Sequence, residues 1–393
     1  MMDNNSWLLP EGIEELLPAQ AARLESLQRK LLDMYVTWGY ELVIPPFIEY
    51  LDSLLTGTGN DLDLQTFKIT DQLTGRLMGI RADMTPQVAR IDAHNLKREV
   101  PSRLCYMGTV LHTRPATHGG RRSPFQAGVE LYGHAGIESD LEVLRLMIAT
   151  LHASGLEEVH LDLGHVGIFR GLARQSGLDQ LAERQLFDAL QRKAKPEIEE
   201  LLQAQPIDSH WRDILESLAD LHGDAAVLDT AEALLGDTDE GVRQALSQLR
   251  RVAAMVGAMP NVSIHFDLAE LRGYHYHTGI VFAAFVSGQG QAIAQGGRYD
   301  DIGRVFGRAR PATGFSTDLK ALLALVPAKT HQLRGIFAPC DESQELDATI
   351  AGLRSKGERV VQALPGQIGD AAAMDCDREL VQQDGSWNVV ELH

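Results

Sequence analysis

Apolar side chains at three- and four-residue spacing predict a first long helix over residues 19–37. Pro18 stands just before this pattern, where the first turn of a helix favours proline. Gly39 follows it and predicts where the helix ends. A strand is expected over 40–44, because the proline at position 45 cannot donate to a sheet.

Alternating apolar and polar residues indicate a strand-rich region over 66–132. Two alternating runs, 103–113 and 125–132, flank a turn-rich segment over 114–124 that contains glycines and arginines. Together they predict a hairpin with a long basic loop.

The middle of the chain differs in kind. Residues 168–259 show a succession of helical patterns without a convincing strand, so we expect a helical insertion. The elements expected around it are a helix over 140–154, a strand over 158–163, strands within 262–286 and at 291–295, and a strand running into a helix over 311–325.

A small α/β unit is expected after Pro327. Strands at 335–338 and 359–364 flank a helix at 343–355, and Asp384-Gly385 is a strong hairpin signal. We therefore expect an α+β protein in three parts: a core of residues 1–167 and 260–327, the insertion 168–259, and a C-terminal domain 333–393.

Composition narrows the classes of partner. Fifty-four acidic residues against 36 basic ones give a formal charge of −18, which repels phosphate backbones and disfavours nucleic-acid binding. Three cysteines without close spacing argue against a disulfide framework and fit a reducing cytoplasm. No signal peptide or apolar run of about 20 residues is visible, so we expect no membrane association.

The run from Arg272 to His277 is the first candidate for chemistry. As a strand it would turn Arg272, Tyr274 and Tyr276 to one face, either as an anion clamp walled by aromatic rings or as an ordinary surface. His275 and His277 would share the other face. No cysteine or second histidine pair completes a metal site, so we expect no metal.

The second strand of the basic hairpin is another candidate. Gln126 and Glu130 share a face with Gly128 between them, which suits a pocket for a ligand carrying an ammonium or imidazole group. A solvated strand face is the alternative. Asp83 and Thr85 stand at an expected helix start, where they would either cap the helix or receive a ligand ammonium.

The basic loop at 118–122 has two readings. It could cradle a phosphate, or it could be the mobile, solvated tip of a hairpin, which is the commoner case for such loops.

Taken in order, these segments resemble the catalytic core of class II histidyl-tRNA synthetases over residues 8–325. The matching segments are 38–49 (motif 1, the family's dimer interface), 81–85, 108–130 (motif 2), 272–278 (the histidine motif) and 296–300. The resemblance implies a synthetase-like antiparallel sheet flanked by helices. It also implies a histidine site formed by Asp83, Thr85, Gln126, Glu130, Arg272, Tyr276, His112, Arg114, Tyr274 and His277.

The sequence departs from the synthetase motifs at the positions whose side chains bind ATP in that family. His112 falls where the family has the motif 2 arginine, and Arg114 where it has an acid. In motif 3, Lys320 and Ala321 replace the glutamate and the second arginine. Loss of fixed cations at the α-phosphate typically costs several kcal/mol of transition-state stabilisation, so the resemblance implies that aminoacylation is lost.

The C-terminal segment also argues against aminoacylation of tRNA. The synthetases end in an anticodon-binding domain of about 100 residues, whereas residues 333–393 hold five basic and eleven acidic side chains, a poor receptor for RNA. The whole chain resembles the regulatory subunits of ATP phosphoribosyltransferase, a glycosyltransferase that begins histidine biosynthesis. That family implies a short-form catalytic subunit as partner, L-histidine as feedback ligand, and no cofactor.

The assembly implied is a homodimer through motif 1 within a hetero-oligomer. The insertion is the favoured docking surface for the catalytic subunit, and the acidic tail is the other. Two alternatives stay open: an active histidyl-tRNA synthetase, and a stand-alone paralogue that uses the pocket for another small substrate.

Overall fold

The structure, a computed structural model, describes residues 7–56, 60–115, 120–270, 276–327 and 335–392. The chain divides into two compact units, Met1–Val326 and Pro327–His393. Within the described residues, no helix has the length and apolar character needed to cross a membrane.

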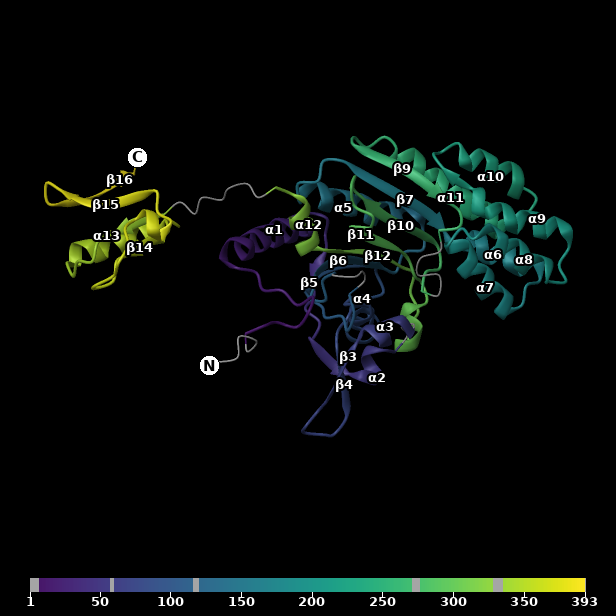
Figure 1. Ribbon diagram of the computed structural model, residues 1–393, viewed down its shortest axis with the longest axis horizontal. Coiled ribbons are helices and arrows are strands. Elements are labelled where there is room, and N and C mark those ends of the chain that lie inside the picture. Colours follow the sequence, from purple (N-terminus) through teal and green to yellow (C-terminus); the bar gives the residue numbers. More distant parts are fainter. Residues whose placement is uncertain (1–6, 57–59, 116–119, 271–275, 328–334, 393) are drawn as a thin grey trace. The chain divides into compact units, whose positions relative to one another are not determined.

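A nine-stranded sheet organises the first unit (Figure 1). Its pairs are antiparallel except for β1–β5 and β7–β9, which run parallel. In spatial order the strands are β1 (Glu41–Leu42), β5 (Ser102–Thr109), β6 (Phe125–Tyr132), β12 (Ala312–Asp318), β11 (Ala294–Arg298), β10 (Ile280–Phe285), β7 (Val159–His165), β9 (Val262–Asp267) and β8 (His222–Gly223).

Helices cover one face of this sheet and bury its main core. The predicted first helix is confirmed as α1 (Pro18–Thr37), with proline at its start, and it packs beside α5 (Ile137–Ala153) and α12 (Leu319–Leu325). The alternation of β6 is confirmed as well: Ala127, Val129 and Leu131 enter this core. The opposite face carries α4 (Thr85–Arg90), the π-helix η1 (Ile91–Leu96) and the short helix η3 (Ile302–Phe306).

A run of helices lies together at one end of the sheet (Figure 1). It comprises α6 (Val166–Ser176), α7 (Gln180–Gln191), α8 (Lys195–Gln203), α9 (Ser209–Ser217), η2 (Leu218–Asp220), α10 (Val227–Leu235) and α11 (Glu240–Val256). The expectation of no strand here was wrong only for the two-residue β8, which pairs with β9. Such a short strand leaves no alternation for sequence to reveal.

A smaller three-stranded sheet stands beside α4. Its order is β2 (Ile48–Tyr50), β4 (Leu77–Ile80), β3 (Phe67–Thr70), with the helices α2 (Leu51–Leu54) and α3 (Asn60–Gln65) between the strands in sequence.

The second unit has a four-stranded sheet and one long helix. Its strands, in order, are β14 (Val360–Gln362), β13 (Ile336–Ala338), β15 (Arg378–Gln383) and β16 (Ser386–Glu391), with helices α13 (Gln344–Ser355) and η4 (Ala372–Met374). The hairpin predicted at Asp384-Gly385 is confirmed: both residues have positive φ, 49° and 78°, as a tight hairpin turn requires.

The boundaries of several predicted strands differ. The strand at 291–295 lies instead at Ala294–Arg298, and the strand over 40–44 shrinks to β1. The strand expected over 272–277 is wrong for Tyr276 and His277, the two residues of this range that the structure describes. Both are irregular, and β10 begins only at Ile280. Ends of elements are set by tertiary packing, which a local pattern does not contain.

Candidate functional site

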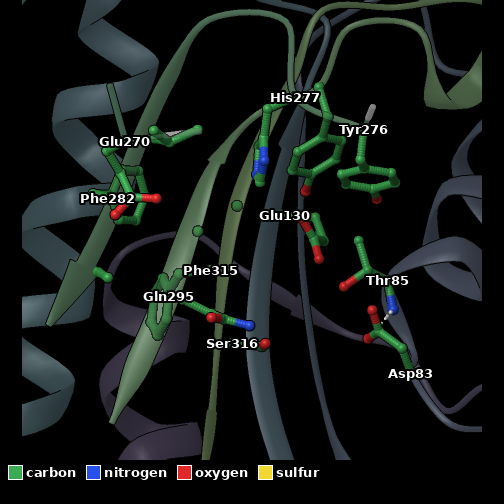
Figure 2. Close-up of a pocket in the computed structure, with 15 residues that line it drawn as sticks. Asp83, Thr85, Glu130, Glu270, Tyr276, His277, Phe282, Gln295, Phe315 and Ser316 are labelled. Atoms are coloured by element: carbon green, nitrogen blue, oxygen red, sulfur yellow. Dashed lines mark hydrogen bonds between the residues drawn. The ribbon is translucent and has the colours of Figure 1, made fainter. Parts of the chain in front are cut away.

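A cavity of about 190 Å³ opens on the α4 face of the large sheet (Figure 2). This volume is smaller than the roughly 300–1,000 Å³ of pockets for drug-sized ligands, so its occupant must be small. The titratable and hydroxyl groups around it come from β6, β12, the start of α4, the segment between β9 and β10 and the residue after β11. They are Asp83, Thr85, Glu130, Glu270, Tyr276, His277, Tyr299 and Ser316.

Two glycines leave room for the polar groups in and next to the cavity. Gly314 pairs with Glu130 across β12 and β6, and a Cβ at this position would overlap Glu130 Oε2 and the Tyr299 hydroxyl. Gly128 pairs with Tyr106, and a Cβ there would overlap the Tyr106 hydroxyl. Both positions therefore require glycine if these polar groups are to converge.

Glu130 is the buried acid of the site. Its side chain is 1% exposed, and Oε1 accepts a hydrogen bond of 3.0 Å from the Tyr106 hydroxyl. Oε2 has no hydrogen-bond partner among the described residues. Burial raises the pKa of Glu130 well above its usual value; the hydroxyls of Tyr106 and Thr85 oppose this shift, and the charge of Asp83 adds to it. The solvated strand face considered above is therefore wrong.

Asp83 is held in place from two sides. Its Oδ1 accepts from the Thr85 N–H (3.0 Å) and from Gln126 Nε2 (2.7 Å), while Gln126 Oε1 accepts from the Met84 N–H (3.0 Å). Gln126 thus supports Asp83 and is not itself part of the cavity lining. The N-cap position of α4 is Met84, yet Asp83 accepts from the first N–H of the helix, so the capping role considered for Asp83 is present from one residue earlier.

Aromatic rings form one wall. The Tyr276 and Tyr299 ring centroids lie 5.0 Å apart, and His277 stands edge-on to Tyr276 at 5.6 Å. Both tyrosine hydroxyls are buried without a hydrogen-bond partner among the described residues. Tyr276 and His277 line the same cavity, so the expected alternation of faces was wrong, because this segment is not a strand.

Other candidate residues lie away from the cavity or outside the described chain. His112 Nε2 is 2.9 Å from the Ala82 carbonyl oxygen, and Arg114 is exposed. Arg272 and Tyr274, with His275, lie outside the described residues.

The described part of the basic loop contacts the N-terminal segment. Arg121 Nε pairs with Glu14 at 2.8 Å, and Arg122 donates to the backbone carbonyls of His112 and Glu11. These contacts contradict a solvated hairpin tip for the two arginines. They also occupy guanidinium groups that a phosphate would need.

Several lining residues were missed from sequence. Glu270 adds a third carboxylate, and Tyr299, Gln295 and Ser316 complete the polar lining. Tyr299 belongs to the 296–300 signature, which could have pointed to it, whereas Glu270 follows β9 in no recognisable pattern.

Among the described lining residues there are three carboxylates and no lysine or arginine, so the cavity favours a cation. No group of three potential metal ligands gathers in the described part of the chain.

Comparisons with known families agree along the whole chain. The family model described as histidyl-tRNA synthetase matches residues 12–322, and the one described as ATP phosphoribosyltransferase subunit HisZ C-terminal domain matches residues 333–390. An ATP phosphoribosyltransferase regulatory subunit from Thioalkalivibrio sulfidiphilus is 60% identical over 100% of both chains. Another from Alkalilimnicola ehrlichii is 59% identical over 97% of this chain and 96% of its own.

Solved structures show the same fold. An ATP phosphoribosyltransferase regulatory subunit/histidyl-tRNA synthetase from Bacillus halodurans C superposes with a TM-score of 0.82 at 28% identity, over 94% of this chain and 96% of its own. Histidyl-tRNA synthetase from Nostoc sp. PCC 7120, at 17% identity and a TM-score of 0.76, covers 98% and 97% and shows the fold alone. The predicted class II synthetase-like α+β fold is confirmed, and the chain belongs to the family of ATP phosphoribosyltransferase regulatory subunits.

Proposed function

We propose that this regulatory subunit binds L-histidine in the acidic cavity, performs no catalysis itself, and transmits feedback inhibition to a short-form ATP phosphoribosyltransferase catalytic subunit. The observation that carries the proposal is Glu130, a buried acid whose Oε2 has no partner among the described residues. Histidine brings the matching donors, an ammonium group and an imidazole N–H, and an unpaired buried acceptor favours a ligand that supplies one.

The absence of the family's ATP-binding arginines supports the proposal that this subunit performs no catalysis. At the motif 2 position, His112 is engaged with a backbone carbonyl. At motif 3, Lys320 Nζ donates to the Ser123 carbonyl oxygen at 2.8 Å, and Ala321 carries no charge. Without arginines at positions 112 and 321, the charge that develops on an α-phosphate during adenylation has less to stabilise it.

We expect no histidine-dependent exchange of pyrophosphate into ATP. The variant Ala321→Arg should stay inactive as well, because groups that act as a unit are strongly non-additive. Pyrophosphate exchange with radiolabelled pyrophosphate measures this directly, with a histidyl-tRNA synthetase as positive control. Exchange by the wild-type protein would instead favour the synthetase alternative.

A homodimer through the motif 1 region is also part of the proposal. Exposed apolar side chains concentrate on β1 and the segment after it, where Leu42, Ile44, Phe47 and Ile48 are all more than 40% exposed. β1 is the edge strand of the large sheet. An exposed apolar patch on a sheet edge is typical of an association surface.

Ile44→Asp should therefore convert the isolated protein to monomers, because it places a charge in the apolar interface; Ile44 is 80% exposed in the single chain. Leu181→Asp is the matched control, since Leu181 on α7 is 66% exposed but lies far from motif 1 in sequence. Light scattering coupled to size exclusion gives the masses. If Ile44→Asp and Leu181→Asp both stay dimeric, or if both become monomeric, the dimer does not depend specifically on the motif 1 surface, which would contradict this interface.

The catalytic partner is tested by reconstitution. Mixing this protein with a short-form catalytic subunit should give a complex whose turnover exceeds that of the catalytic subunit alone and falls when histidine is added. We favour the helical run α6–α11 as docking surface over the acidic tail. A complex that forms without any effect of histidine would contradict the feedback role.

A further inference from the structure

We propose that Tyr106, which does not line the cavity, is the positioning residue that turns both Thr85 and Glu130 into hydrogen-bond acceptors toward the ligand. The inference rests on the proposed function of this cavity as the histidine site. It adds a physical reason why the site selects a ligand rich in N–H donors.

The assignment follows from counting protons. The Tyr106 hydroxyl oxygen lies 3.0 Å from Glu130 Oε1 and 3.0 Å from Thr85 Oγ1. It carries one proton. Once Glu130 is ionised, as pairing with a ligand cation requires, its carboxylate can only accept, so that proton goes to Glu130. The Thr85 hydroxyl then donates to the Tyr106 oxygen or to Glu130, with which it also interacts, and in either case its own proton is used.

Both ends of this chain of hydrogen bonds reach the cavity as acceptors. Thr85 lines the cavity with only lone pairs left on Oγ1, and Glu130 presents Oε2, which has no partner among the described residues. Asp83 stands beside them as a third acceptor. Three convergent acceptors favour an ammonium or imidazole N–H and disfavour carboxylate or phosphate groups.

The fold reserves space for this hydroxyl. Tyr106 is 0% exposed on β5, and its cross-strand partner on β6 is Gly128, where any Cβ would overlap the Tyr106 oxygen. Thr85 opens α4, and its backbone N–H is held by Asp83, so its side chain is fixed relative to Tyr106. The arrangement is therefore built around the Tyr106 hydroxyl.

Removing the hydroxyl should change the protonation of the site as well as its geometry. The Tyr106 hydrogen bond lowers the pKa of Glu130 against the effect of burial. Without it Glu130 keeps its proton to higher pH, and Thr85 regains a free donor. The other titratable groups around Glu130 are unchanged by the substitution; those described are Asp83, Glu270, Tyr276, His277, Tyr299 and Tyr132.

Calorimetric titration of L-histidine between pH 6 and 9 tests the inference with Tyr106→Phe. We expect binding about tenfold to a hundredfold weaker than wild type at pH 7, with the deficit shrinking toward pH 9 as Glu130 ionises. Tyr132→Phe is the matched control, because Tyr132 is equally buried on β6 and its hydroxyl has no partner among the described residues. It should follow the wild-type profile at every pH.

The outcomes separate the inference from the function it rests on. A Tyr106→Phe profile parallel to wild type, or equal to it, overturns the positioning role and leaves the histidine site standing. Wild-type protein that binds no histidine at any pH overturns the proposed function itself. If Tyr106→Phe does not fold, as judged by thermal melting, the pair Thr85→Val and Thr85→Ser decides: serine should restore the affinity that valine loses, and equal affinities overturn the inference.

Discussion

Replacing Glu130 with glutamine should weaken histidine binding by roughly 1.5–3 kcal/mol, the range for hydrogen bonds that involve a charged group. The same change should leave the ligand-free protein as stable as wild type or more stable. Glu130 is buried with an unpaired oxygen, and a neutral amide of similar shape avoids the cost of burying a carboxylate. Calorimetry gives the affinity and thermal unfolding the stability. If Glu130→Gln binds histidine as tightly as wild type, or if it loses affinity only because the variant unfolds, the assignment of Glu130 as a histidine-binding residue would be contradicted.

The stability difference should depend on pH in a defined direction. Because burial raises the pKa of Glu130, the folded protein binds a proton that the unfolded chain has released above its ordinary glutamate pKa of about 4.3. More protons on the folded state mean that stability falls as pH rises through this window. The advantage of Glu130→Gln over wild type should therefore be small near pH 4 and grow toward neutral pH. Other buried acids are common to both proteins and cancel in the comparison.

Gln126→Ala should give a complex with the catalytic subunit that assembles and turns over but resists histidine. Gln126 does not line the cavity; it holds Asp83 through a 2.7 Å hydrogen bond and ties it to the backbone of Met84. Truncation leaves Asp83 free to move and should weaken histidine binding by roughly 1–3 kcal/mol. Inhibition curves of the reconstituted complex measure the shift to higher histidine concentration.

Gln72→Ala is a suitable control, since this residue lies in the turn between β3 and β4, away from the cavity lining. It should leave the inhibition curve in place. Equal histidine inhibition of wild type and Gln126→Ala would mean that sensing occurs elsewhere, most simply on the catalytic subunit.

Sequence predicted the site best where the motif lies on a regular strand. The alternation of β6 correctly put Glu130 opposite the main core, because side chains on a strand alternate in direction whatever the tertiary context. It erred at Tyr276 and His277, where the chain before β10 is irregular and alternation does not apply.

The remaining elements of the site depend on contacts between distant segments. Tyr106 and Thr85 are 21 residues apart, and nothing local indicates that their hydroxyls meet. Glu270 reaches the cavity only because β9 and β10 are brought together by the large sheet. Gln126 was predicted as a histidine-binding residue; the structure shows its amide bonded to Asp83, a contact that no spacing encodes.

Paired titrations of histidine, with and without a saturating catalytic subunit, test the central claim most directly. If the cavity is the regulatory site, the partner must change histidine affinity by the same factor by which histidine changes the affinity for the partner, because coupling free energy is reciprocal. Couplings of this kind typically amount to about 1–3 kcal/mol, or roughly 5- to 150-fold. We predict such a shift for wild type and its loss in Glu130→Gln. Identical histidine affinity in the free and the assembled wild-type protein would contradict the account.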